Sequence, residues 1–177
     1  MDNKKFSHAE LNQIACKWLL SMGCTIVLSE LKTWGTFEIA DVIGFKSGFS
    51  IVIESKTSRS DFLADKKKPW RKDPKKGMGN YRFFLCEEGI IKPEDLPPKW
   101  GLLHPWGIKV KKAVYPKVMG FWAGDTSFYQ DCYMEGERGL LVSAAMRLGN
   151  QHTNISDKIY FKKCFQIDKE ISHDQRI

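Results

Sequence analysis

Two carboxylates and an amine lie close together in the first third of the sequence. Asp41 is followed after twelve intervening residues by Glu54, and Lys56 comes two residues later. The apolar runs that carry them meet at Ser47-Gly48, which favours a hairpin with a two-residue loop because glycine supplies the positive φ that such turns need. Opposite residues then have numbers that sum to 95, so Asp41 faces Glu54 directly. Because side chains alternate along a strand, all three charged groups are predicted to emerge on one face of a sheet.

This arrangement predicts a site for a divalent cation. Like charges directly across a strand pair repel, so something must offset the repulsion between Asp41 and Glu54. Mg²⁺ (or Mn²⁺) would do so, because hard divalent cations prefer oxygen ligands and are usually held by one or two carboxylates. We expect Asp41 and Glu54 as ligands, with the carbonyl of Ser55 as a further oxygen. The Lys56 ammonium would lie beside the metal, where it can position or help deprotonate a water that attacks a phosphodiester.

A predicted helix over residues 7–22 brings a third carboxylate, Glu10, into consideration. Apolar residues recur along it at spacings of three and four, and Ser7 with Glu10 three residues later forms the pattern of a capping box. If Ile14 and Trp18 pack on the sheet, Glu10 on the same stripe points toward the predicted site. Two interpretations of Glu10 therefore stay open: assistance at the metal, or capping with Ser7.

The other elements follow from periodicity and from turn residues. A helix is predicted from Ser60 to Lys67, with Ser60 as its N-cap, and a basic loop from Arg71 to Asn80. Asp61 and Asp65 of that helix are expected to face solvent. Strands are predicted over residues 24–31, 36–45, 50–56, 81–86, 101–104, 108–113 and 158–167, and a further helix over 137–148. Residues 115–134 remain unassigned.

The positive charge of the chain is concentrated in one segment. Net charge is −1 over residues 1–54, +7 over 55–82 and +1 over 83–177. Such a segment suits a polyanion, most commonly nucleic acid, although a solvated lysine-rich loop is an equal alternative. The predicted phosphate contacts are Lys66, Lys67, Lys68, Arg71, Lys72, Lys75 and Lys76.

The motif D-x12-E-x-K at the end of an apolar strand, preceded by a helix that bears Glu10, resembles the PD-(D/E)XK nuclease superfamily. The runs 40–44, 51–56 and 58–67 and the strand that begins at Tyr81 are most similar to its MmcB-like group, which is associated with DNA repair. The resemblance spans residues 7–113, and Ala40 stands where the motif name has proline. It implies an α/β, restriction-endonuclease-like fold, with a mixed four-stranded core sheet flanked by helices. It also implies metal binding by Asp41 and Glu54 and a catalytic role for Lys56.

Length and composition bound the class of protein. A chain of 177 residues with 42% apolar residues fits a single domain, here a nuclease-like core over 7–113 and an extra α+β extension over 114–177. No run approaches the roughly 18 apolar residues of a membrane span, and the start does not resemble a secretory signal, so we expect a cytoplasmic protein without a membrane partner. The five cysteines contain no C-x-x-C pair, which disfavours a disulfide framework or a zinc knuckle. The four histidines are dispersed, and none is assigned as a ligand.

The sequence therefore predicts a Mg²⁺-dependent endonuclease whose partner is nucleic acid, with DNA favoured. The main alternative is a non-catalytic nucleic-acid-binding or protein-interaction module on the same fold. A weaker alternative is action on RNA. A homodimer is possible, since double-strand cutting usually needs two active sites, and a part in DNA repair, a mobile element or a phage would each fit.

Overall fold

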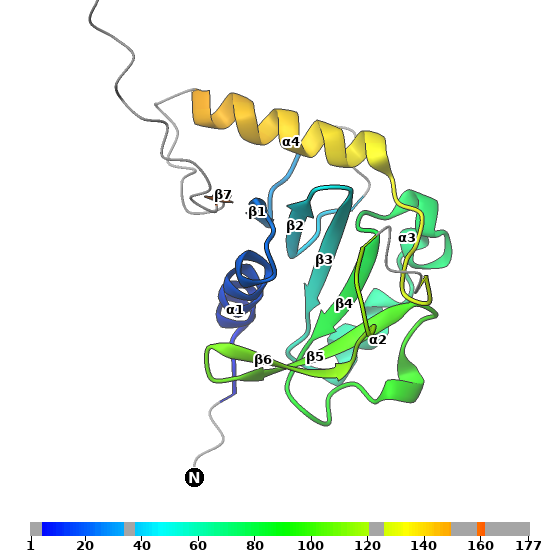
Figure 1. The fold of residues 1–177 in the computed structure, drawn as a ribbon. Helices are drawn as coiled ribbons and strands as arrows, with labels where there is room; N and C mark the ends of the chain where they lie inside the picture. Colours follow the sequence, from blue (N-terminus) through cyan, green and yellow to red (C-terminus); the bar gives the residue numbers. More distant parts are fainter. Residues whose placement is uncertain (1–4, 34–37, 121–125, 150–158, 162–177) are drawn as a thin grey trace, which may run out of the picture.

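The computed structural model describes residues 5–33, 38–120, 126–149 and 159–161. In these residues seven strands form one mixed sheet, in the order β6-β5-β4-β3-β2-β1-β7 (Figure 1). β3 and β4 are parallel, as are β4 and β5, and the other neighbouring pairs are antiparallel. The strands are β1 (Ile26–Ser29), β2 (Val42–Lys46), β3 (Phe49–Ser55), β4 (Tyr81–Leu85), β5 (Trp100–Trp106), β6 (Lys109–Val114) and β7 (Ile159–Phe161). The prediction of a mixed sheet with flanking helices is confirmed. The sheet has seven strands where four were expected in the core.

The β2–β3 hairpin has the predicted register. Val42 pairs with Ile53 and Lys46 with Phe49, so partner numbers sum to 95. Gly48 takes a φ of 90° in the two-residue loop, a value that glycine adopts without strain. The next step along the register sets Asp41 opposite Glu54, just beyond the last ladder pair.

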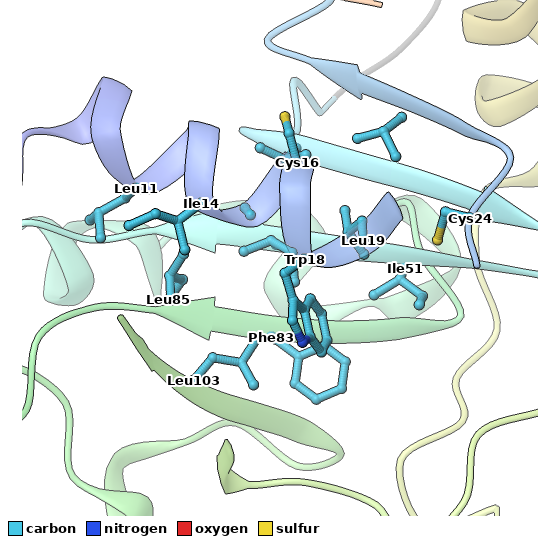
Figure 2. Close-up of a cluster of buried hydrophobic side chains, with 14 of the residues drawn as sticks. Leu11, Ile14, Cys16, Trp18, Leu19, Cys24, Ile51, Phe83, Leu85 and Leu103 are labelled. Carbon is cyan, nitrogen blue, oxygen red and sulfur yellow. The ribbon is translucent and has the colours of Figure 1, made fainter. Parts of the chain in front are cut away.

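Helix α1 (His8–Ser21) covers one face of the sheet. Its buried residues Leu11, Ile14 and Trp18 meet the side chains of β3 and β4 and the Leu103 side chain of β5 (Figure 2). Trp18 contacts the Phe83 ring edge-on, with the ring centroids 6.0 Å apart. The helix begins with the predicted capping box, because Ser7 and Glu10 exchange hydrogen bonds between side chain and backbone. Both the helix and the packing of its apolar stripe are therefore confirmed.

The opposite face is covered by α2 (Arg59–Asp65), α3 (Pro69–Lys72) and α4 (Met134–Gly149). Phe62 of α2 packs against Phe84, and Leu140 of α4 joins an apolar cluster with Val52. Short 3₁₀ turns lie at η1 (Pro74–Lys76) and η2 (Pro93–Asp95). The N-cap of α2 is Ser58, whose hydroxyl accepts from the Asp61 amide at 3.2 Å, and not Ser60 as predicted.

Residues 126–149 pack directly on the predicted core. The amide of Gln130 donates to the Asn80 carbonyl at 2.9 Å, and the Tyr129 ring contacts Tyr81. Glu137 of α4 accepts from the Ser50 hydroxyl at 2.8 Å. The predicted helix over 137–148 is confirmed and begins three residues earlier. Of the strand predicted over 158–167, residues 159–161 form β7 and the rest lie outside the described residues, as do 36 and 37 of the strand predicted over 36–45.

Candidate functional site

Asp41, Glu54 and Lys56 come together at the ends of β2 and β3. The Lys56 Nζ lies 3.3 Å from Glu54 Oε2, and the side chains of both residues are almost completely buried. The Asp41 side chain is 18% exposed, and its Oδ2 accepts a hydrogen bond from the Ser55 amide at 2.9 Å. The site is therefore open to solvent on the Asp41 side and closed on the Glu54 side.

Glu54 has one oxygen that its protein neighbours do not satisfy. Its Oε2 pairs with Lys56 and with Arg71, whereas its buried Oε1 has no hydrogen-bond partner among the described residues. Burial raises the pKa of Glu54 to about 7, and the negative charge of Asp41 adds to this effect. A buried carboxylate oxygen without a donor is costly, and a cation between Asp41 and Glu54 would satisfy it. The donor set thus fits a hard divalent ion.

The Lys56 amine is held as an ammonium. Burial alone would lower the pKa of Lys56, but the attraction of Glu54, Asp65 and Asp41 outweighs it and raises the pKa. An amine in this state can orient a water or offset phosphate charge, but it is a poor proton acceptor at neutral pH. Of the two roles that the sequence predicts for Lys56, the geometry favours positioning and charge compensation over deprotonation.

A buried ion network surrounds Glu54 and Lys56. The Arg71 guanidinium lies 2.5 Å from Glu38, 2.6 Å from Asp65 and 3.1 Å from Glu54, and its side chain is 2% exposed. The Lys56 Nζ also forms an ion pair with Asp65 Oδ1 at 3.5 Å. The structure thus places Arg71 inside the protein and not on a phosphate-binding surface, and it buries Asp65, which the sequence analysis set in solvent. Asp65 follows the buried Phe62 by three residues in α2, and this spacing is a signal for its burial.

His8 is a further site residue that the sequence did not reveal. Its Nε2 lies 3.2 Å from Asp41 Oδ2, and this hydrogen bond raises the pKa of His8 although burial opposes the shift. Its Nδ1 lies 3.4 Å from the Asn12 amide nitrogen and 3.7 Å from Glu30 Oε1. Glu10, in the same turn, accepts from the Ser7 amide at 2.8 Å and from the Ser7 hydroxyl at 2.9 Å. The structure supports the capping interpretation of Glu10 and brings its neighbour His8 to Asp41.

The predicted basic segment divides into two groups. Lys66 lies over the Phe62 ring at 4.9 Å, and Lys68 lies 2.6 Å from Asp65, so both amines already have local partners. Lys67, Lys72, Lys75 and Lys76 are exposed as whole residues, and two of them face exposed carboxylates: Lys75 lies 4.0 Å from Asp131 and Lys76 lies 3.7 Å from Asp73. These four are the members of the predicted phosphate-binding set that the fold leaves on the surface.

Metal binding would rest on few protein ligands. Within the described parts of the chain, no group of three or more histidine, cysteine, aspartate or glutamate side chains is placed to hold a metal ion. Asp41 and Glu54, with the Ser55 carbonyl, are therefore the donors that the fold offers. Two carboxylates with retained waters are a usual set for Mg²⁺.

Comparisons with known proteins bear on the fold alone. No protein-family model matches the sequence, and no curated protein matches it. A solved structure of a protein of unknown function from Silicibacter pomeroyi is similar, with a TM-score of 0.56 and 22% sequence identity over 84% of this chain and 91% of that chain. The likeness supports a mixed α/β fold with flanking helices. In the described residues, no helix has both the length and the apolar character needed to cross a membrane.

Proposed function

We propose that the protein is a metal-dependent nuclease that hydrolyses phosphodiester bonds in DNA. One observation carries the proposal: the β2–β3 register sets Asp41 opposite Glu54, and Glu54 keeps a buried oxygen without a partner beside Lys56. Two carboxylates that can hold a divalent ion, with an ammonium beside them, are groups that can carry out metal-assisted hydrolysis of a phosphodiester.

The arrangement of elements supports a restriction-endonuclease-like fold. Within the larger sheet, β1, β2 and β3 are successive antiparallel strands and β4 lies parallel to β3. Helix α1 precedes this four-stranded unit, and the connection from β3 to β4 contains α2, α3 and η1. The candidate site lies at the carboxyl end of β3, where Ser55 pairs with Leu85 at the end of β4.

Each group has a role in this proposal. Asp41, Glu54 and the Ser55 carbonyl would hold Mg²⁺ or Mn²⁺, which when bound supplies a polarised water and compensation of phosphate charge. Lys56 orients the attacking water and offsets the charge that develops on the phosphate. His8 positions the Asp41 carboxylate through its 3.2 Å contact.

A non-catalytic module on the same fold is the second candidate, and the closed ion network favours it. Glu54 is already paired with Lys56 and Arg71, and the side chains of all three are at most 4% exposed. In this alternative, the pairs serve only the fold and the surface lysines bind nucleic acid without cleavage. The two candidates differ in their response to metal, since only the nuclease needs a divalent ion at Asp41 and Glu54.

The test is cleavage of supercoiled plasmid, labelled single-stranded DNA and labelled RNA in Mg²⁺, in Mn²⁺ or in chelator. The variants are Asp41→Asn and Glu54→Gln, which remove charge and keep shape, and the control is Glu94→Gln, an exposed carboxylate of η2 away from the proposed site. We expect metal-dependent cleavage that falls on the order of 100-fold or more in both site variants and is unchanged in the control.

Three outcomes decide between the candidates. Cleavage at the wild-type rate in either site variant would refute the ligand assignment. Salt-sensitive DNA binding that is equal in all four proteins, with no cleavage in any metal, would support the non-catalytic module. Cleavage of RNA alone would keep the site and change the substrate.

A further inference from the structure

The tip of the β5–β6 hairpin exposes two large apolar side chains. Trp106 is 73% exposed and Ile108 is 71% exposed, and they flank Gly107. Trp106 pairs with Lys109, so the loop contains only Gly107 and Ile108, and Gly107 takes a φ of 59°. At this exposure the two side chains add little to the core, and an indole presented on a tight turn is suited to contact with a partner.

Lysines follow this tip along β6. Residues 96–124 contain five lysines and no acidic residue. Three of them, Lys109, Lys111 and Lys112, lie on the exposed edge strand β6. Lys111 pairs with Glu88 at 2.5 Å, and Lys112 lies over the Tyr115 ring at 4.2 Å. The hairpin therefore joins a positive strip to an exposed aromatic ring, the combination that proteins use to bind single-stranded nucleic acid.

The hairpin extends from the edge of the sheet at which the candidate site lies. β3, β4 and β5 are parallel, and Ser55 is level with Leu85, which is level with Leu103. The carboxyl ends of the three strands thus meet at one edge, and Trp106 lies three residues beyond Leu103. β6 also contacts α1, and Figure 1 shows the hairpin reaching out beside the start of that helix. A strand of nucleic acid held at the candidate site would have the hairpin beside it.

We propose that the β5–β6 hairpin binds unpaired DNA, with Trp106 stacked on an exposed base and Lys109 and Lys111 on neighbouring phosphates. This inference rests on the proposed function and names the form of its substrate. Stacking requires a base whose face is free, and bases in an intact duplex are covered by their neighbours. The protein therefore prefers single-stranded or strand-opened DNA over intact duplex.

The test uses fluorescence anisotropy of a fluorescein-labelled oligothymidine of about 20 nucleotides, longer than the site size of one small domain, and of a duplex of equal length, both in chelator. Trp106→Ala should weaken binding to the single strand by about 5- to 150-fold, the range for loss of one base–aromatic stack. Met134→Ala is the matched control, because Met134 is 71% exposed on α4, and it should bind as the wild type does. Lys109→Gln with Lys111→Gln should reduce the slope of log K against log salt by about 1.4, or about 0.7 for each phosphate contact.

Equal affinity of Trp106→Ala and wild type for the single strand would overturn the inference, as would tighter binding of wild type to the duplex. Loss of binding to phosphatidylserine vesicles in Trp106→Ala, with unchanged oligonucleotide binding, would overturn it in favour of a lipid-facing tip. Failure of this inference is separable from failure of the proposed function. Wild-type cleavage in Mg²⁺ with normal binding by Trp106→Ala refutes the hairpin alone. A Trp106-dependent affinity without any cleavage supports the hairpin and refutes the nuclease.

Discussion

Replacement of Arg71 by methionine should destabilise the protein strongly, because three buried carboxylates depend on its guanidinium. Arg71→Met keeps much of the side-chain volume and removes contacts of 2.5, 2.6 and 3.1 Å to Glu38, Asp65 and Glu54. Lys56 still neutralises part of the cluster, from 3.3 Å to Glu54 and 3.5 Å to Asp65. Removal of one partner from a buried ion pair costs about 3–5 kcal/mol, and we expect a loss in this range. For a chain of this size, that loss corresponds to a decrease in Tm of roughly 6–20 °C.

The assay is urea unfolding followed by circular dichroism, with Arg59→Met as the matched control. Arg59 also binds a carboxylate through two nitrogens, Asp95 at 2.5 and 2.7 Å, but its side chain is 45% exposed. Exposed pairs contribute little, so the control should lose far less stability than Arg71→Met. If the two variants are equally stable, the buried network does not hold the fold as described. If Arg71→Met leaves stability unchanged and weakens DNA binding, Arg71 is the surface phosphate contact that the sequence predicted.

Three further predictions concern the pH dependence, the basic surface and the attachment of α4. Burial alone would raise the pKa of Asp65, but its cationic partners lower this pKa to about 2. The stability that the Asp65 carboxylate contributes is therefore complete above pH ~4 and is lost as pH falls through about 2. In urea titrations at several pH values, Asp65→Asn should remove about 2 kcal/mol of this acid-dependent loss, and an unaltered pH profile would contradict the pairing. Simultaneous change of Lys72, Lys75 and Lys76 to glutamine should reduce the slope of log K against log salt for duplex DNA by about 3, whereas an unaltered slope would make these lysines a solvated loop. Glu137→Leu removes the acceptor of the buried Ser50 hydroxyl and of the Gly79 amide, and it should lower the stability measured by thermal unfolding by about 1–3 kcal/mol. Glu137→Gln keeps an acceptor and should lose clearly less stability. Equal losses of stability in the two variants would refute the role of these hydrogen bonds.

Local signals predicted the part of the site that lies in one hairpin. The two-residue loop at Gly48 fixes the register, and the register alone sets Asp41 opposite Glu54. The capping box at Ser7 likewise marks the start of α1 correctly. Each of these features depends on residues close together in the chain, so their geometry follows from sequence without knowledge of the tertiary structure.

The ion network could not be predicted in the same way, because its partners are distant in sequence. Arg71 meets Glu38 across 33 positions, and it comes from a lysine-rich segment whose composition resembles a solvated surface. A lysine-rich stretch has the same net charge whether one of its arginines points inward or outward. Only the packing of α2 and α3 over β3 decides that Arg71 and Asp65 are buried.

The positive charge of the β5–β6 hairpin does not show in the net charge of residues 83–177 as a whole. Residues 83–177 together hold thirteen basic and twelve acidic side chains, although residues 96–124 contain lysines without acidic residues. The structure of residues 115–134 could not be predicted for a different reason: Tyr129 and Gln130 are positioned by contacts with Tyr81 and Asn80, which are distant in sequence. Neither residue has a periodic pattern around it that would have revealed this packing.

The central claim, that Asp41 and Glu54 hold a divalent cation, is tested most directly by calorimetric titration of Mg²⁺ and Mn²⁺ into the wild-type protein, Asp41→Asn and Glu94→Gln. We predict one site per chain in the wild type and in Glu94→Gln, and loss of that site in Asp41→Asn. Saturating Mg²⁺ at about 100 times its Kd should also stabilise the wild type by about 2.7 kcal/mol. Equal binding of metal by all three proteins, or no binding by the wild type, would contradict the claim and leave the carboxylates as members of a structural ion network.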